Sequence, residues 1–71
     1  MSNYRLYEQV HANLVRAGQT WSCKRMGIKH HYSDFGAAMR AVEKLFAHFP
    51  SRQYCVLEYA DSTNSKIVYV T

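Results

Sequence analysis

The sequence predicts an α+β fold in which one helix packs on one face of a small antiparallel sheet of four strands, in the order strand, strand, helix, strand, strand. Residues 33–50 place apolar side chains at helical spacing, whereas the segments before and after them alternate between apolar and polar residues. A run of turn-forming residues separates the last two alternating segments. With 71 residues the chain has the size of one small domain, and we expect residues 1–71 to form a single unit.

The N-terminal segment is predicted to be the first, half-buried strand. Tyr4, Leu6 and Val10 would lie on one face, and Arg5, Tyr7 and Gln9 on the other. A helix that ends at Gly18 also fits the spacing of the apolar residues, so that alternative stays open. The tyrosine-rich opening favours the strand, because aromatic side chains suit a pleated surface.

Residues 20–26 are predicted to form the second strand. Trp21, Cys23 and Arg25 would point to one side, and the residues between them to the other. Gly27 then interrupts the alternation before residues 28–32, and a glycine inside a strand pattern indicates a bulge or a bend. The basic residues of this region would therefore lie along a kinked strand.

The helix is the element that the sequence determines most strongly. Its apolar positions fall within an arc of about 120°, the width of a core-facing stripe. Ser33 is the predicted N-cap, Asp34 suits the positive end of the helix dipole, and Pro50 ends the helix at Phe49. The predicted buried stripe consists of Phe35, Ala38, Met39, Val42, Leu45, Phe46 and Phe49.

Residues 53–60 and 66–71 are predicted to form a C-terminal hairpin around the turn formers of residues 61–65. Cys55, Leu57 and Tyr59 would share one face of the first of these strands. Because the helix covers one side of the sheet, the other side is open to solvent or to a partner. If residues 66–71 form a sheet edge, a homodimer through this strand is possible, whereas packing of the same side chains inside one copy is the favoured interpretation.

Positive charge is concentrated in one third of the sequence. No acidic residue lies between Glu8 and Asp34, so the basic residues of that window supply the whole formal net charge of +4. An acidic partner is the natural inference, and a solvated basic face is the alternative. The predicted binding residues, cations with aromatic rings between them, are Arg16, Trp21, Lys24, Arg25, Lys29, His30, His31 and Tyr32.

No catalytic or ligand-binding motif accompanies these residues. Cys23 and Cys55 lack the spacing of a redox or zinc site, and we expect them to be buried free thiols. Adjacent histidines on a strand point to opposite faces, which argues against a metal site at His30 and His31. We therefore expect a protein that is not an enzyme and uses no metal and no cofactor, with a small ribonuclease-type toxin as a remote alternative.

Two classes of partner suit the predicted site. Cations beside aromatic rings suit DNA or RNA, because charge neutralises phosphate and bases stack on rings. The same composition suits a protein, since tyrosine buries a large area with few rotatable bonds. We expect a protein complex that handles nucleic acid, with nucleic acid itself as the alternative. The sequence lacks an apolar leader and a run of membrane-spanning length, so we expect a cytoplasmic location and no membrane partner.

The order of segments along the chain resembles the small ββαββ accessory proteins of phages and mobile elements, and some anti-CRISPR proteins share this size and arrangement. The segments that carry the likeness are NYRLYEQV, TWSCKRMGIKHHY, SDFGAAMRAVEKLFAHFP, YCVLEYAD and KIVYV. The resemblance rests on layout, so it transfers no functional residue. It implies an inhibitor or accessory factor that binds a nucleic-acid-handling complex by contact, in the cytoplasm of a host cell. Many such inhibitors are acidic mimics of nucleic acid. This chain is basic, which favours an acidic protein patch or the nucleic acid as its target.

Overall fold

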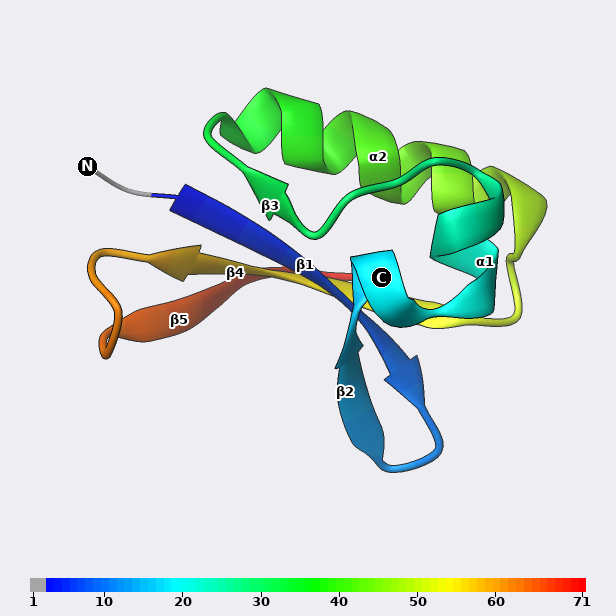
Figure 1. Ribbon diagram of the computed structural model, residues 1–71, viewed down its shortest axis with the longest axis horizontal. Coiled ribbons are helices and arrows are strands. Elements are labelled where there is room, and N and C mark those ends of the chain that lie inside the picture. The colour runs from blue at the N-terminus through cyan, green and yellow to red at the C-terminus, as the bar shows by residue number, and fades with distance from the viewer. Residues whose placement is uncertain (1–2) are drawn as a thin grey trace.

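The structure is a computed structural model that describes residues 3–71, in which five strands form one antiparallel sheet and helices cover one of its faces (Figure 1). The predicted α+β fold class is confirmed. The strands are β1 (Asn3–Val10), β2 (Asn13–Arg16), β3 (His31–Tyr32), β4 (Gln53–Tyr59) and β5 (Ser65–Val70). The helices are the 3-10 turn η1 (Ala17–Gln19), the short α1 (Trp21–Arg25) and the main helix α2 (Phe35–His48).

The two central strands of the sheet, β1 and β4, lie far apart in the sequence. The strand order is β2-β1-β4-β5, and β1 pairs with β4 from Asn3 opposite Tyr59 to Gln9 opposite Gln53. Since β4 occupies one edge of β1, β2 and β3 share the other edge, β2 along the second half of β1 and β3 along the first. The predicted N-terminal strand is therefore confirmed, and the helical alternative for it is wrong.

The hairpin between β1 and β2 is a feature that the sequence does not predict. Its turn places His11 at φ +58°, a left-handed backbone conformation that glycine or asparagine usually supplies in a tight hairpin. Leu14 is half exposed, and β2 as a whole lacks a buried side chain in this part of the structure, residues 13–16. The turn therefore lacks the glycine or asparagine typical of a hairpin at His11, and the strand lacks the alternation of buried and exposed residues that would predict it.

Residues 20–26 contain helix α1 and not the predicted strand, so that prediction is wrong. The neighbouring residues Ser22 and Cys23 are both fully buried. The first turn of α1 rests on the core and packs both side chains inward, so these residues meet their burial as a helix and not as an alternating strand. Gly27, at φ +68°, follows the helix, and the N–H of Ile28 donates to the carbonyl of Cys23 at 2.8 Å. Gly27 therefore ends a helix in the left-handed conformation instead of forming a bulge.

Helix α2 confirms the predicted helix, with corrections at its N-terminus and in its stripe. The N-cap is Asp34 and not Ser33, because the helix begins at Phe35 and the Asp34 carboxylate accepts from the N–H of Ala37 at 2.9 Å. Phe35 and Phe46, predicted to be buried, are 38 % and 43 % exposed. The buried positions of the helix are Ala38, Ala41, Val42 and Leu45.

The predicted C-terminal hairpin is confirmed as β4 and β5. Asp61 organises its loop, where the carboxylate accepts from the N–H groups of Thr63 at 2.8 Å and Asn64 at 2.9 Å. One additional residue, Val68, shifts the register between the two strands. Strand β5 lies at an edge of the sheet, which meets the condition stated above for residues 66–71.

The hydrophobic core lies between the sheet and the two α-helices. Figure 1 shows α1 and α2 on the same side of the central strands. Burial of each large apolar side chain in this layer contributes about 1.5–3 kcal/mol to stability. In the described part of the chain, no helix is both long and apolar enough to cross a lipid bilayer. The buried members from sheet and helices are Leu6, Ala17, Cys23, Ala38, Ala41, Val42, Leu45, Tyr54 and Val56.

Candidate functional site

The sheet has one face that the helices cover and one that they leave open. Leu6 and Val56 are paired and fully buried in the core, which marks the covered face. Side chains alternate along a strand, so Arg5 and Tyr7 point to the other side, together with the residues opposite them. We call this side the open face, and its positions are Asn3, Arg5, Tyr7, Gln9, Leu14, Arg16, His31, Gln53, Cys55, Leu57, Tyr59, Ser65, Ile67 and Val70.

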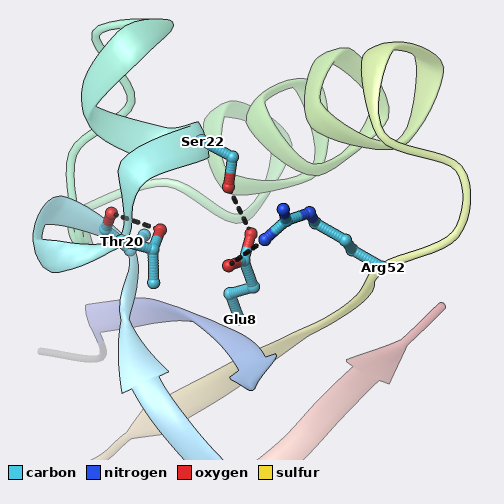
Figure 2. A network of polar contacts seen from close by, with 5 residues as sticks. Glu8, Thr20, Ser22 and Arg52 are labelled. Carbon is cyan, nitrogen blue, oxygen red and sulfur yellow. Dashed lines mark hydrogen bonds and ion pairs between the residues drawn. The ribbon is translucent and has the colours of Figure 1, made fainter. Parts of the chain in front are cut away.

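Both glutamates of the sheet lie on the covered face. Glu8 is 1 % exposed, and Figure 2 shows its carboxylate between the hydroxyl of Ser22, which donates to it, and Arg52, whose Nη1 lies 3.4 Å away. Glu58 accepts from the Tyr4 hydroxyl at 3.1 Å. Among residues 3–71, no Asp or Glu occupies a position of the open face.

Cations and aromatic rings occupy the half of the open face formed by β1, β2, β3 and the end of β4. The Arg5 guanidinium lies 4.0 Å from the ring centroid of Tyr59, a cation–π contact. The hydroxyls of Tyr59 and Tyr7 are 3.2 Å apart. Arg16 lies opposite Tyr7, and His31 lies opposite Arg5. We call Arg5, Arg16 and His31 with the two tyrosines the cationic half.

The hydrogen bond between the two tyrosines sets which of them ionises first. The bond to Tyr7 lowers the pKa of Tyr59, and the charge of Arg5 lowers it further. Burial raises the pKa of Tyr7, and its bond to Tyr59 adds to the rise. In the bonded pair the phenol of Tyr59 is therefore the more acidic of the two.

His30 supports this half from the edge of the sheet. Its Nδ1 lies 2.8 Å from the carbonyl oxygen of Leu6, and its ring meets Tyr7 edge-on at a centroid distance of 5.0 Å. Burial lowers the pKa of His30; the bond to Leu6 opposes this, and the nearby charges of Arg16 and Arg5 lower the pKa further. At neutral pH His30 therefore contributes a neutral ring and not a charge.

Aliphatic side chains occupy the other half of the open face, formed by β4 and β5. Ile67 is 60 % exposed and Val70 is 57 % exposed. A groove of about 120 Å³ lies beside them, lined also by Leu14 of β2 and by the buried Cys55. We call Leu57, Ile67 and Val70 the aliphatic half. Exposed apolar residues that gather in one place indicate an interaction site more than scattered ones do.

The structure does not bring the eight predicted binding residues together on one surface. Arg16, His30 and His31 lie on or beside the open face. A second group lies on α1, on the covered side of the sheet, and a third lies at the β3 edge. The second group consists of Trp21, Lys24 and Arg25, and the third of Lys29 and Tyr32.

The group on α1 forms a small cluster of its own. Trp21 is 62 % exposed, packs edge-on against Phe49 at 6.2 Å, and has the Arg25 guanidinium 5.2 Å from its ring centroid. At the β3 edge, Lys29 Nζ lies 5.4 Å from the ring of Tyr32. In each of these two groups, a cation therefore lies beside an aromatic ring of its own group.

Arg5, Tyr7 and Tyr59 are members of the candidate site that the sequence-based list omits. The sequence places Arg5 and Tyr7 on the same face of the first predicted strand, opposite the face of Leu6. The missing information was the pairing of β1 with β4, which sets Tyr59 beside Arg5. Only that pairing turns two separate strand faces into one surface.

The two thiols lie on opposite faces of the sheet. Cys23 and Cys55 are free and buried, as predicted, and burial raises the pKa of both thiols. Elevated pKa values reduce the thiolate fraction that nucleophilic chemistry requires. Across residues 3–71, no group of three His, Cys, Asp or Glu side chains is placed to hold a metal ion.

No family model matches the chain, and neither the curated proteins nor the solved structures include a significant match.

Proposed function

We propose that this chain is a non-catalytic binding protein that docks through the open face of its sheet on an acidic surface of a partner protein. The observation that carries the proposal is the sorting of charge across the sheet. Glu8 and Glu58 face the helices, while Arg5, Arg16 and His31 face outward beside Tyr7 and Tyr59. Such a surface attracts acidic groups and offers flat rings for contact.

The aliphatic half favours a protein as the partner. Ile67 and Val70 are more than half exposed and lie next to the cationic half. Burying exposed aliphatic groups contributes to protein–protein association, whereas interfaces with nucleic acid are more polar and depend mainly on charge.

Direct binding of single-stranded DNA or RNA is the second candidate function. Tyr7 and Tyr59 lie on the two central strands of an open antiparallel sheet, with Arg5 against one of the rings. Aromatic rings on an open sheet are platforms for unpaired bases, and arginine adds contact to phosphate. On this hypothesis the aliphatic half takes no part.

The resemblance in layout to the accessory proteins of phages and mobile elements suggests which partner the chain binds and what role it has. The partner would be a complex that handles nucleic acid, and the chain would act as an inhibitor or accessory factor of the anti-CRISPR kind. The basic open face then suits an acidic protein patch of that complex. Pairing of a second copy through residues 66–71 stays a prediction.

Two matched double variants test which basic cluster binds. Arg5→Gln with Arg16→Gln removes two charges from the open face, and Lys24→Gln with Arg25→Gln removes two from α1; each pair includes one arginine stacked on a ring. Binding partners are recovered from an extract of the source cells with the unmodified chain, purified, and titrated against all three proteins. In parallel, labelled single- and double-stranded DNA and RNA are titrated over a salt series.

We expect the open-face variant to lose affinity for the purified partner by about tenfold or more, and the α1 variant to retain it. Loss confined to the α1 variant would overturn the proposal. Salt-dependent binding of an oligonucleotide that only the open-face variant loses would establish the second candidate instead. Turnover of RNA by the unmodified chain would contradict both.

A further inference from the structure

We propose that the open face seats an acidic amphipathic α-helix of the partner protein, lying along the strands. The inference rests on the proposed function and gives the partner segment its chemistry. In this complex the sheet is covered on both sides, by α2 on one and by the partner's helix on the other, which is a stable layer arrangement for a sheet with two partly apolar faces.

The division of the open face runs parallel to the strands. In one row across the sheet His31, Arg5, Leu57 and Ile67 follow each other, and in the next row Arg16, Tyr7, Cys55 and Val70. In these two middle rows the basic or aromatic positions come first and the apolar ones last, whereas the flanking rows, one of Asn3, Tyr59 and Ser65 and the other of Leu14, Gln9 and Gln53, do not repeat this order. Over the two middle rows, a ligand aligned with the strands meets basic side chains along one flank and apolar side chains along the other.

The spacing of the rows matches a helix. Successive positions on one face of a strand are about 7 Å apart. In a helix, residues i and i+4 are separated by about 6 Å along the axis. Arg5 and Arg16 lie one row apart on neighbouring strands, so carboxylates at i and i+4 of the partner would reach both guanidinium groups through the length of the arginine side chains. An apolar stripe on the adjoining side of the same helix would lie over Ile67 and Val70.

A helix fits this face better than an extended segment. A single strand laid on the face of a sheet leaves its backbone N–H and carbonyl groups without partners as they are buried, whereas a helix satisfies them internally. The groove of about 120 Å³ is also small beside the roughly 300–1,000 Å³ of sites for small molecules, and suits one apolar side chain.

Three synthetic helical peptides of about 18 residues, a length that spans the sheet, test the inference on the full chain. The first carries a leucine stripe flanked by glutamates at i and i+4. The second has lysine in place of each glutamate, and the third has alanine in place of each leucine. Binding is followed by changes in the backbone amide NMR signals of the ¹⁵N-labelled protein.

We expect the first peptide to bind and to shift signals of β1, β4 and β5 rather than α2. The lysine peptide should bind at least tenfold more weakly, and the alanine peptide about fivefold more weakly. In the protein, Arg16→Gln and Ile67→Ser should each weaken the first peptide about threefold or more, while Lys44→Gln on the exposed side of α2 leaves binding unchanged.

Equal binding of the glutamate and lysine peptides, no binding of the first peptide, or signal changes confined to α2 would overturn the inference. The proposed function fails separately, when the purified partner binds the Arg5→Gln, Arg16→Gln protein as tightly as the unmodified chain. A partner that needs those arginines but offers no acidic helix leaves the function standing and removes this inference.

Discussion

Glu8 shows how a single residue ties three distant parts of the chain together. Its carboxylate is buried on β1, accepts from Ser22 at the start of α1, and lies near Arg52, which precedes β4 (Figure 2). The side chain of Arg52 is 43 % exposed, so that guanidinium keeps water when its partner is removed. The main cost of losing Glu8 is then the hydroxyl of Ser22, left buried with no acceptor, and the space that opens.

We therefore expect Glu8→Ala to lower the free energy of unfolding by about 2–4 kcal/mol. Glu8→Gln keeps an oxygen that accepts from Ser22 and should lower it by about 1–2 kcal/mol. Urea denaturation measures both. Glu43→Ala on the exposed side of α2 is the control and should change stability by less than about 0.5 kcal/mol. A similar effect of Glu8→Ala and Glu43→Ala would contradict the structural role of the buried carboxylate.

Asp61 makes the loop of the C-terminal hairpin sensitive to acid. Hydrogen bonds from Thr63 and Asn64 lower its pKa to about 2. Since the pKa is below the value of about 3.9 in an unfolded chain, the stabilisation is complete above about pH 4 and is lost as the pH falls toward 2. An NMR titration of the Asp61 carboxyl should give a midpoint near 2 together with shifts of the loop amides. Asp61→Ala should abolish the acid-dependent shifts of those amides, and a midpoint near 4 would show that the bonds do not form in solution.

At the scale of the elements, the start of α2 offers a clean comparison of two adjacent residues. Asp34 caps the helix through the N–H of Ala37, whereas Ser33 lies one position outside. Asp34→Ala should destabilise the protein by about 1 kcal/mol, and Ser33→Ala by a few tenths at most. Thermal unfolding followed by circular dichroism measures both. A larger loss for Ser33→Ala would mean that the helix begins one residue earlier in solution.

Elements with strong local signals could be predicted from the sequence, and those fixed by tertiary contacts could not. The apolar stripe of residues 33–50 and the turn formers of residues 61–65 determined α2 and the β4–β5 hairpin. Helix α1 is five residues long, too short to be stable alone, and forms because Ser22 and Cys23 are buried against the core. An alternating pattern over so few residues is compatible with either structure, and here the packing decides.

The candidate site was only partly predictable for the same reason. The sequence identified Arg16 and His31 as residues of a binding surface, and the structure sets both on the open face. It also grouped Trp21 and Lys24 with them, because a strand over residues 20–26 would have placed all of these on one sheet. The short helix instead carries that pair to the covered side.

On the scale of the whole molecule, the two thiols report how cooperatively the chain unfolds. Cys23 is 0 % and Cys55 is 6 % exposed, on opposite sides of the sheet. A thiol reagent such as dithionitrobenzoate should therefore react with the native protein at least a hundredfold more slowly than with the chain in urea. Cys55→Ala isolates Cys23, whose rate should follow global unfolding. Rapid reaction of Cys23 under native conditions would show that α1 detaches on its own.

The pairing of β1 with β4 also has a kinetic consequence. Strand β1 finds its central neighbour β4 only beyond α2, so folding must close a loop that contains β2, β3 and the three helices of the described residues, and such closure is slow. During translation β1 is made well before β4, and the nascent strand has to wait, exposed to chaperones and proteases, until the segment of β4 has also left the ribosome.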